Sequence, residues 1–288
     1  MFQTGVILSA TTARGHDLPR TVRIGQEERV FEALAFNAPW LDLALEGPLT
    51  PWTLQLAHAD EGTRLPILLG LEEDPFSDGL THLPNDICPV AGVILRTKAL
   101  IASIKTAPLH AFVRNVFQRR DVLDTFWIMP ASGRDHHSYP GGLAVHSQEV
   151  ADDLSVHLGL SDLELDLGIA GSLLHDIGKV WSYTDDMFPN AASLAMGHEL
   201  VGLCRLEPEL ARLERAWPDG AYVMRCLLSG NSRMRENGSH PSSLLQRIKA
   251  CDQRSCERDR VASGSRRASR PVWTPRAWDD RPSDEFQA

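Results

Sequence analysis

The spacing of apolar residues divides this chain into a β-rich first third and a helical remainder. In the first third, short β-prone stretches occupy residues 4–10, 21–24, 30–35, 53–57 and 65–69. Glycine, proline and aspartate separate these stretches, as is typical of short strands joined by turns. Several short strands at this spacing predict a small barrel or sandwich. From residue 93 onward, apolar residues recur every three to four positions, which is the period of a helix.

The helical pattern is interrupted often enough to define separate helices. Residues 93–127 predict two helices with a break near Pro108, because proline disrupts the interior of a helix. Ser161 and Glu164 have the form of a capping box, which marks the start of a helix that runs to the motif near residue 175. The remaining predicted helices are at residues 143–158, 197–213, 220–228 and 241–260.

Two segments lack a regular period and predict loops. Residues 72–89 are rich in aspartate, proline and glycine, which favours a linker or a long surface loop. Residues 130–142 contain two prolines and three glycines around the adjacent histidines His136 and His137. We therefore expect this second segment to be a polar loop that carries two histidines.

These patterns predict an α+β protein with a small β-rich module at residues 1–95 and an all-α domain at residues 96–261. Residues 262–288 are rich in serine, arginine, proline and aspartate without periodicity, so we expect a disordered tail. An oligonucleotide-binding (OB-like) barrel is one interpretation of the module. Its few aromatic residues would serve either a base-stacking surface or the core. They are Phe31, Phe36, Trp40 and Trp52.

Composition and charge narrow the classes of function. The net charge of −9 argues against a protein that coats nucleic acid through general phosphate neutralisation. Residues 254–281 nevertheless hold eight arginines against four acidic residues, which suits either a solvated tail or a local phosphate contact. The five cysteines never form a C-x-x-C pair, so we expect buried thiols in a reducing compartment. Because no leader-like or membrane-spanning apolar run occurs, we expect a cytoplasmic protein without membrane contact.

Four polar residues lie where the pattern predicts buried helix faces. His175 and Asp176 follow an apolar helical run that we expect to end at Gly178. A buried carboxylate needs a cation or several donors, and the histidine nitrogen beside it makes the pair a candidate metal site. His146 lies on the core-facing side of its helix, and Asp252 on the apolar stripe of the last helix. Each alone is more often structural, but together they are suited to converge on one divalent ion.

Two stretches of this sequence resemble one family. Residues 126–150, FWIMPASGRDHHSYPGGLAVHSQEV, and residues 170–179, AGSLLHDIGK, are similar to the HD-domain metal-dependent phosphohydrolase superfamily. The similarity covers about residues 100–260 and points to two branches. One comprises the bacterial 3′–5′ exoribonucleases that join an oligonucleotide-binding barrel to an HD domain. The other is the HD relaxase (TraI-like) region of conjugative-transfer proteins.

The resemblance implies an α-helical HD domain that hydrolyses a phosphoester with a bound divalent ion, either Mn, Mg, Ni, Fe or Zn. The implied metal ligands are His146, His175, Asp176 and Asp252. Asp176 and Lys179 would be catalytic, with Lys179 contacting the scissile phosphate or the leaving oxygen. A lysine at a helix end also complements the helix dipole, which is the alternative for Lys179. His136 and His137 match paired histidines of both branches and would contact substrate or support the ligands; the alternative is that they belong to a loop surface.

One position departs from the family pattern. Relatives with two metal ions carry two further histidines, and His198 matches the first of them. At the second position this chain reads LSGNS at residues 228–232, so no histidine is present near Asn231. A single-metal enzyme or a weakened site is therefore compatible with the sequence. His198 itself is either a ligand or a residue that packs at the start of a helix.

We expect a metal-dependent phosphohydrolase that acts on single-stranded RNA or DNA, which makes it a nuclease. Two alternatives stay open. One is a nucleotide phosphohydrolase, and the other is a catalytically impaired HD protein that serves as a nucleic-acid-binding or conjugative-transfer accessory factor. The sequence leaves the number of metal ions and the oligomeric state open.

Overall fold

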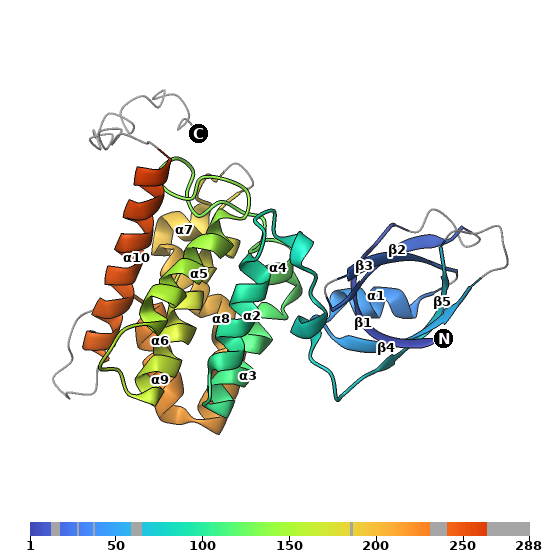
Figure 1. Ribbon diagram of the computed structural model, residues 1–288, viewed down its shortest axis with the longest axis horizontal. Helices are drawn as coiled ribbons and strands as arrows, with labels where there is room; N and C mark the ends of the chain where they lie inside the picture. The colour runs from blue at the N-terminus through green and yellow to red at the C-terminus, as the bar shows by residue number, and fades with distance from the viewer. Residues whose placement is uncertain are drawn as a thin grey trace, which may run out of the picture.

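The structure, a computed structural model, describes residues 1–12, 18–27, 29–36, 38–58, 65–184, 187–230 and 241–263. It is a mixed α+β fold in which a five-stranded barrel precedes a group of packed helices. The barrel lies at one end of the molecule and the helices at the other (Figure 1). The predicted α+β class and the order of its two parts are therefore confirmed.

The barrel contains the strands β1 (Phe2–Ala10), β2 (Arg20–Gln26), β3 (Arg29–Ala35), β4 (Pro51–Ala57) and β5 (Ile67–Glu73). It closes in the order β1-β2-β3-β5-β4, with every pair antiparallel except β3 with β5. Side chains alternate between the two faces of each strand, so apolar residues such as Ile7, Ile24 and Leu54 are fully buried inside. Each predicted β-prone stretch corresponds to one strand.

One helix of this part is not predicted by the apolar pattern. The helix α1 (Trp40–Glu46) lies between β3 and β4 and buries Leu41 and Ala44 in the barrel core. At seven residues it is too short to display a helical period clearly. The aromatic residues packed against this core are Phe31, Trp40 and Trp52. These three residues therefore contribute to packing, whereas Phe2 and Phe36 are exposed.

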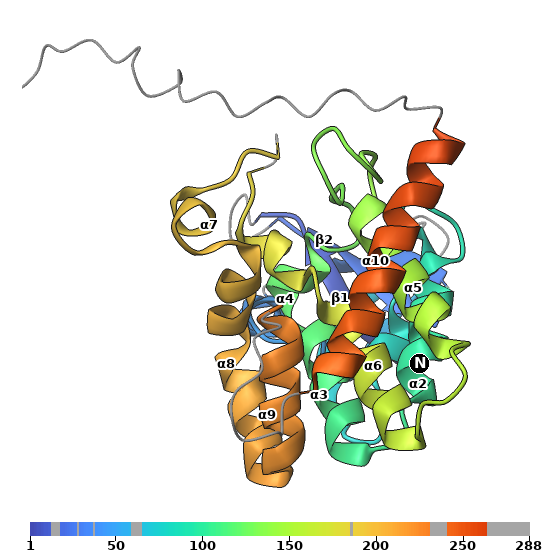
Figure 2. The same cartoon turned by 90° about the vertical axis from the view of Figure 1, so that its left-hand side faces the viewer.

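The helical part contains α2 (Val93–Ser103), α3 (Ala107–Phe117), α4 (Arg120–Leu123), α5 (Gly142–Ser155), α6 (Asp162–Leu174), α7 (Ala191–Met196), α8 (His198–Ala216), α9 (Pro218–Leu228) and α10 (Ser242–Ala262). A 3₁₀ helix, η3 (Ile177–Trp181), follows α6. The helix α5 packs on α6 and α10, while α8 packs on α3, α9 and η3 (Figure 2). The predicted break near Pro108 is correct, because this proline lies in the first turn of α3.

The segment at residues 72–89 is not the open linker that its composition predicts. Its first two residues belong to β5, and two short 3₁₀ helices follow, η1 (Gly79–His82) and η2 (Asn85–Ile87). Leu80 and Leu83 are buried in the same core cluster as the helical part. The turn-forming residues therefore shape a packed connection, because leucines between them supply apolar area to bury.

The barrel and the helices are joined by direct packing as well as by the chain. The guanidinium of Arg120 donates to the carbonyl oxygens of Ile7, Leu8 and Ala44 at 2.9, 3.1 and 3.2 Å. Leu49 of the barrel part lies in the core cluster of the helices, and its N–H donates to a backbone carbonyl in the helical part. A charged side chain that satisfies buried carbonyls fixes the angle between two surfaces.

Two further predictions concern membrane-spanning segments and the C-terminal tail. Within the described part of the chain, no helix combines the length and the apolar character needed to cross a membrane. The helix α10 continues through Ala262, one residue into the segment expected to be a tail. The rest of that predicted tail, from residue 264 onward, lies outside the described residues.

Candidate metal centre

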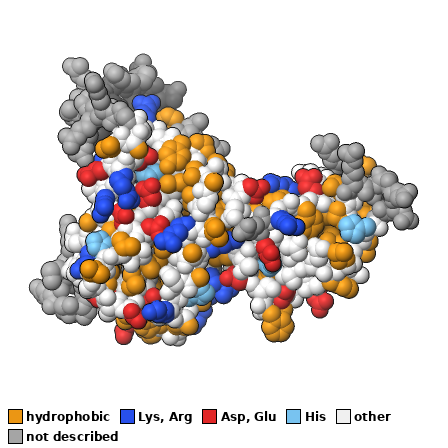
Figure 3. All heavy atoms as spheres, viewed as in Figure 1, with side chains coloured by type: hydrophobic (Ala, Val, Ile, Leu, Met, Phe, Trp, Pro, Cys, Tyr) orange, Lys and Arg blue, Asp and Glu red, His pale blue; other side chains and the backbone are white. Residues whose placement is uncertain are grey.

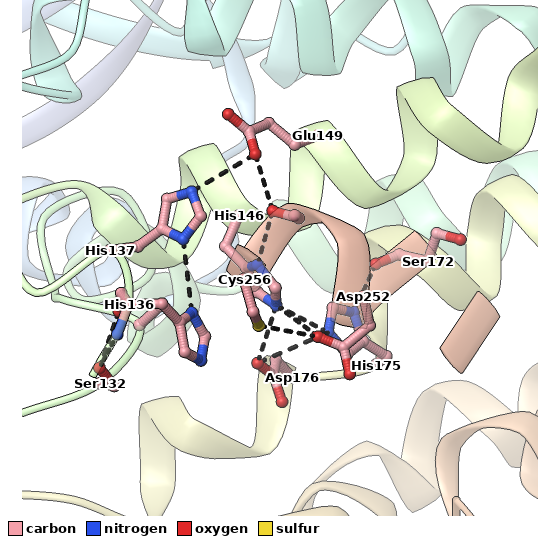
Figure 4. Close-up of polar contacts among 12 residues, drawn as sticks. Ser132, His136, His137, His146, Glu149, Ser172, His175, Asp176, Asp252 and Cys256 are labelled. Carbon is pink, nitrogen blue, oxygen red and sulfur yellow. Dashed lines mark hydrogen bonds and ion pairs between the residues drawn. The ribbon is translucent and has the colours of Figure 1, made fainter. Parts of the chain in front are cut away.

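Three helices supply the four residues that the sequence singles out as metal ligands. His146 comes from α5 and Asp252 from α10. His175 is the C-terminal cap of α6, and Asp176 immediately precedes η3. Because α5 packs against both α6 and α10, the fold brings all four side chains together (Figure 4).

The role of Gly178 differs from the predicted one. The helix α6 ends at Leu174 rather than at Gly178, and the glycine lies inside η3. A Cβ atom at residue 178 would lie 1.9 Å from the carbonyl oxygen of His198 and 3.0 Å from the backbone nitrogen of Gly202. The absence of a side chain therefore allows η3 to touch the start of α8, which places His198 beside Asp176.

The ligand atoms are close enough to share an ion. Nε2 of His146 lies 3.3 Å from Nε2 of His175, 3.1 Å from Oδ1 of Asp252 and 3.6 Å from Oδ2 of Asp176. Nε2 of His175 lies 3.5 Å from Oδ2 of Asp176 and 4.0 Å from Oδ1 of Asp252. Two imidazoles and two carboxylates within these separations form a donor set that suits a divalent transition metal.

Hydrogen bonds orient both imidazoles toward this centre. Nδ1 of His175 lies 2.7 Å from the carbonyl oxygen of Ser172, which can only accept, so Nδ1 carries the proton. Nδ1 of His146 lies 3.1 Å from Oγ of Ser255, whose hydroxyl donates to Oε2 of Glu149 at 2.7 Å. The serine oxygen therefore accepts from Nδ1–H of His146. In both histidines the anchored Nδ1 leaves Nε2 to point to the centre.

Glu149 and Ser255 are site residues that sequence reasoning missed. Glu149 lies three residues after His146 on α5, and Ser255 three residues after Asp252 on α10. Burial alone would raise the pKa of Glu149, but hydrogen bonds from His137 and Ser255 outweigh it and lower this pKa. Its carboxylate is thus ionised at neutral pH and accepts the serine proton. Helical spacing is the signal that could have identified both residues.

Asp176 is buried and surrounded by cationic or proton-donating groups. Burial by itself would raise its pKa, but Lys179 and the nearby histidines outweigh burial and hold the pKa of Asp176 well below its usual range. Nζ of Lys179 donates to Oδ2 of Asp176 at 2.6 Å and to the carbonyl oxygen of Ala131 at 2.8 Å. Lys179 is itself buried, so in this structure its ammonium group supports Asp176 directly.

His198, the residue that matches the additional histidine of two-metal relatives, lies at the centre. Its Nε2 is 3.0 Å from Oδ1 of Asp176, the oxygen opposite to the one that Lys179 contacts. Nδ1 of His198 lies 3.5 Å from Oε2 of Glu199. A histidine so placed is positioned either to hold the carboxylate or to coordinate an ion that the carboxylate binds.

The two adjacent loop histidines contact each other, with their Nδ1 atoms 3.4 Å apart (Figure 4), and each has a further neighbour. His136 lines the cavity beside the ligands, and burial, followed by the charges of His146 and Lys179, lowers its pKa to about 4. His137 is buried and its backbone has a positive φ of 46°. Its backbone N–H donates to Oδ2 of Asp259 at 2.7 Å. Nε2 of His137 faces Oε2 of Glu149 at 3.4 Å. His136 is thus available to a ligand, whereas His137 fastens the loop to α5 and α10.

A cavity of about 330 Å³ opens over the ligand cluster. Its lining includes the polar residues His136, His175, Asp176, Lys179, His198 and Asp252. Apolar residues, including Leu227, Leu245 and Ile248, line it as well. A lining that combines apolar side chains with a few polar groups is typical of pockets that bind small ligands.

Arginines at the start of the basic stretch are engaged in ion pairs. Arg258 contacts Asp153 at 2.9 Å, and Arg260 contacts Asp135 at 2.6 Å. On the face shown in Figure 3, basic and acidic side chains of the helical part are interspersed. The structure does not describe the arginines after residue 263. It also does not describe residues 231–240, which include Asn231, near which the family pattern has a second histidine, and His240, the next histidine along the chain.

Comparison with family models, with curated proteins and with solved structures finds no match to this chain. The site is therefore characterised by its own geometry. Buried histidine and carboxylate groups that could hold a metal ion are present among the described residues, including His146, His175 and Asp176.

Proposed function

We propose that this protein is a divalent-metal-dependent phosphoester hydrolase of the HD type that acts on single-stranded nucleic acid. The observation that carries the proposal is the convergence of His146, His175, Asp176 and Asp252 from three helices, with the last three lining a cavity. Sequence motifs separated by about 30 and 75 residues thus meet at one point, as the resemblance to HD phosphohydrolases requires.

The residues fit the ion that the proposal needs. Both imidazoles anchor Nδ1 in a hydrogen bond and present Nε2 to the centre, and contacts with His146 and His175 lower the pKa of Asp252 despite its burial. A bound divalent ion would supply Lewis-acid polarisation of a phosphoryl oxygen and lower the pKa of a water molecule. Lys179 would keep Asp176 ionised and its oxygens oriented, while His136 and His198 would face the phosphate.

The architecture of the barrel supports nucleic acid as the substrate class. Its strand order β1-β2-β3-β5-β4, with α1 between β3 and β4, is similar to that of OB-like barrels, many of which bind oligonucleotides. The acidic net charge of −9 favours binding through a restricted surface over general coating.

The direct test is cleavage of labelled single-stranded RNA and DNA by the purified full-length protein with Mn²⁺, Mg²⁺ or Ni²⁺. We expect metal-dependent hydrolysis that EDTA abolishes and that Asp252→Asn lowers by at least about a thousandfold. Asp219→Asn is the matched control, because this carboxylate is exposed in the first turn of α9. Wild type that cleaves no more than Asp252→Asn would refute the hydrolase proposal.

A nucleotide phosphohydrolase is a second candidate because of the size of the cavity. At about 330 Å³ it is near the lower end of ligand pockets and suits one nucleotide more readily than a longer strand. A screen of mononucleotides in the same assay separates the two substrates. Nucleic-acid binding that is unaltered by His175→Ala, without turnover of any substrate, would support the accessory-factor alternative.

A further inference from the structure

A cysteine lies at the candidate metal centre, one helical turn after Asp252. Cys256 is buried, and its Sγ lies 3.5 Å from Oδ1 of Asp252 (Figure 4). Residues four apart share one face of a helix, so α10 directs both side chains toward α5. The sequence predicted only that the cysteines are buried thiols, and nothing in their spacing marked this one.

Two histidines approach the thiol from other elements. His136 comes from the loop before α5 and His146 from α5 itself. One ring nitrogen of each and Sγ of Cys256 all lie within 4.8 Å of one another. Tetrahedral zinc, with bonds of about 2.0 Å to nitrogen and 2.3 Å to sulfur, sets its ligands roughly 3.5 Å apart.

This second group differs in chemistry from the carboxylate-rich one. Two imidazoles and a thiolate favour borderline and soft ions such as Zn²⁺ and Co²⁺. His175 with Asp176 and Asp252 adds oxygen donors, which harder ions such as Mn²⁺ and Mg²⁺ prefer. The cavity therefore offers two donor sets of different preference within one space.

The two sets share one ligand atom. Nδ1 of His146 donates to Ser255, so Nε2 is the single lone pair that this residue can offer. Nε2 of His146 lies 3.3 Å from Nε2 of His175 on one side, and the ring centroid of His136 lies 5.0 Å from that of His146 on the other. A neutral imidazole nitrogen binds one ion at a time, so occupation of one set denies this ligand to the other.

We propose that His136, His146 and Cys256 form a second, sulfur-containing ion position that takes Zn²⁺ or Co²⁺ and competes for His146 with the position formed by His175, Asp176 and Asp252. Binding replaces the S–H bond of Cys256 with one metal–sulfur bond and releases the proton to solvent. The inference concerns ion binding alone, so it stands or falls separately from the hydrolase activity.

The test is titration of metal-free full-length protein with Co²⁺, followed by absorption spectroscopy. We expect a near-ultraviolet thiolate-to-cobalt charge-transfer band that Cys256→Ser abolishes, and a Co²⁺ affinity at least about tenfold lower in His136→Ala. Cys251→Ser is the matched control, because Cys251 is buried on the same helix and faces His157 instead. A missing band in the wild type, or a band retained in Cys256→Ser, would overturn the proposal.

Two further measurements need no substitution. Zinc X-ray absorption of the wild type should show a sulfur neighbour at about 2.3 Å, and a shell of nitrogen and oxygen alone would contradict the assignment. Protein loaded with Mn²⁺ should release it when Zn²⁺ is added, as followed by the paramagnetic resonance of free Mn²⁺. If Mn²⁺ stays bound while zinc acquires a sulfur ligand, the shared use of His146 is wrong.

Discussion

Two buried carboxylates at opposite ends of α6 are stabilised in different ways. Near the start of the helix, Oδ2 of Asp166 accepts from the N–H groups of Lys105 and Thr106 at 3.0 and 2.7 Å, and from the Thr106 hydroxyl at 2.7 Å. Beyond its end, Asp176 is surrounded by three histidines and the ammonium group of Lys179. Both are nearly inaccessible to solvent, so burial does not distinguish them.

The difference lies in whether the partners can be exchanged. The donors to Asp166 are fixed in the backbone at the start of α3, and they cannot leave without disrupting that turn. The partners of Asp176 are titratable side chains beside a cavity, and an ion can replace the protons between them. A buried carboxylate is therefore a candidate functional group when its partners are themselves ligands or acids.

The largest expected effect comes from removing the charge of Asp176 while Lys179 remains. Asp176→Asn leaves a buried ammonium group without its counter-ion, which should lower the free energy of unfolding by about 3–5 kcal/mol. Urea denaturation of the metal-free protein measures this, and titration calorimetry with Mn²⁺ should show that binding is lost. The double variant Asp176→Asn/Lys179→Met should recover most of the stability but not the binding. Equal instability of both variants would show that Lys179 is not the cause.

Asp166→Ala should affect stability alone. It leaves the donors of Lys105 and Thr106 unsatisfied at the start of α3, so we expect the free energy of unfolding to fall by about 3 kcal/mol. The affinity for Mn²⁺, measured by calorimetry below the melting temperature, should stay within about twofold of wild type. A variant that folds normally but loses Mn²⁺ binding would break the contrast between the two ends of α6.

Addition of metal should distinguish the roles of Asp166 and Asp176 in one experiment. Mn²⁺ at about a hundred times its Kd should stabilise the wild type by roughly 2.7 kcal/mol, because only the folded state assembles the ligands. The same increment is expected in Asp166→Ala and none in Asp176→Asn. Thermal unfolding with and without EDTA measures it, and a gain in Asp176→Asn would indicate that the ion binds elsewhere.

The smallest expected effect concerns the hydrogen bond that orients His146. Ser255→Ala removes the acceptor for Nδ1–H, so Mn²⁺ affinity should fall by about 10- to 100-fold. The free energy of unfolding should fall by about 1–3 kcal/mol, because a buried donor loses its partner. Nitrogen NMR of the metal-free protein should show that the proton of His146 no longer resides only on Nδ1. Ser255→Thr, which keeps the hydroxyl, should restore both properties. Unchanged affinity in Ser255→Ala would remove the assigned role.

The sequence predicts those parts of the fold and site that follow a regular period. The strands and the long helices are found because their apolar residues repeat over several turns. The short helices α1, α4 and α7 are missed because four to seven residues do not display a period. His146 and Asp252 are predictable as polar residues on apolar stripes, and HDIGK as a motif.

The supporting residues are predictable only in part. Glu149 and Ser255 lie at helical spacing from His146 and Asp252, but their hydrogen bond depends on α5 and α10 lying side by side. His136 and His137 are adjacent in sequence and remain in contact through their Nδ1 atoms. The sequence does not show that His137 also faces Glu149 while His136 lines the cavity.

The position near the metal centre that least accepts a larger side chain is Gly178, which has no side chain and takes no part in binding. At Gly178 a single hydrogen occupies the space between η3 and the carbonyl of His198. Any larger group must push α8 away from η3, and His198 would retreat from Asp176 with it. Genetic screens of this protein should therefore find alanine at position 178 as damaging as the loss of a ligand, although alanine there removes no hydrogen bond.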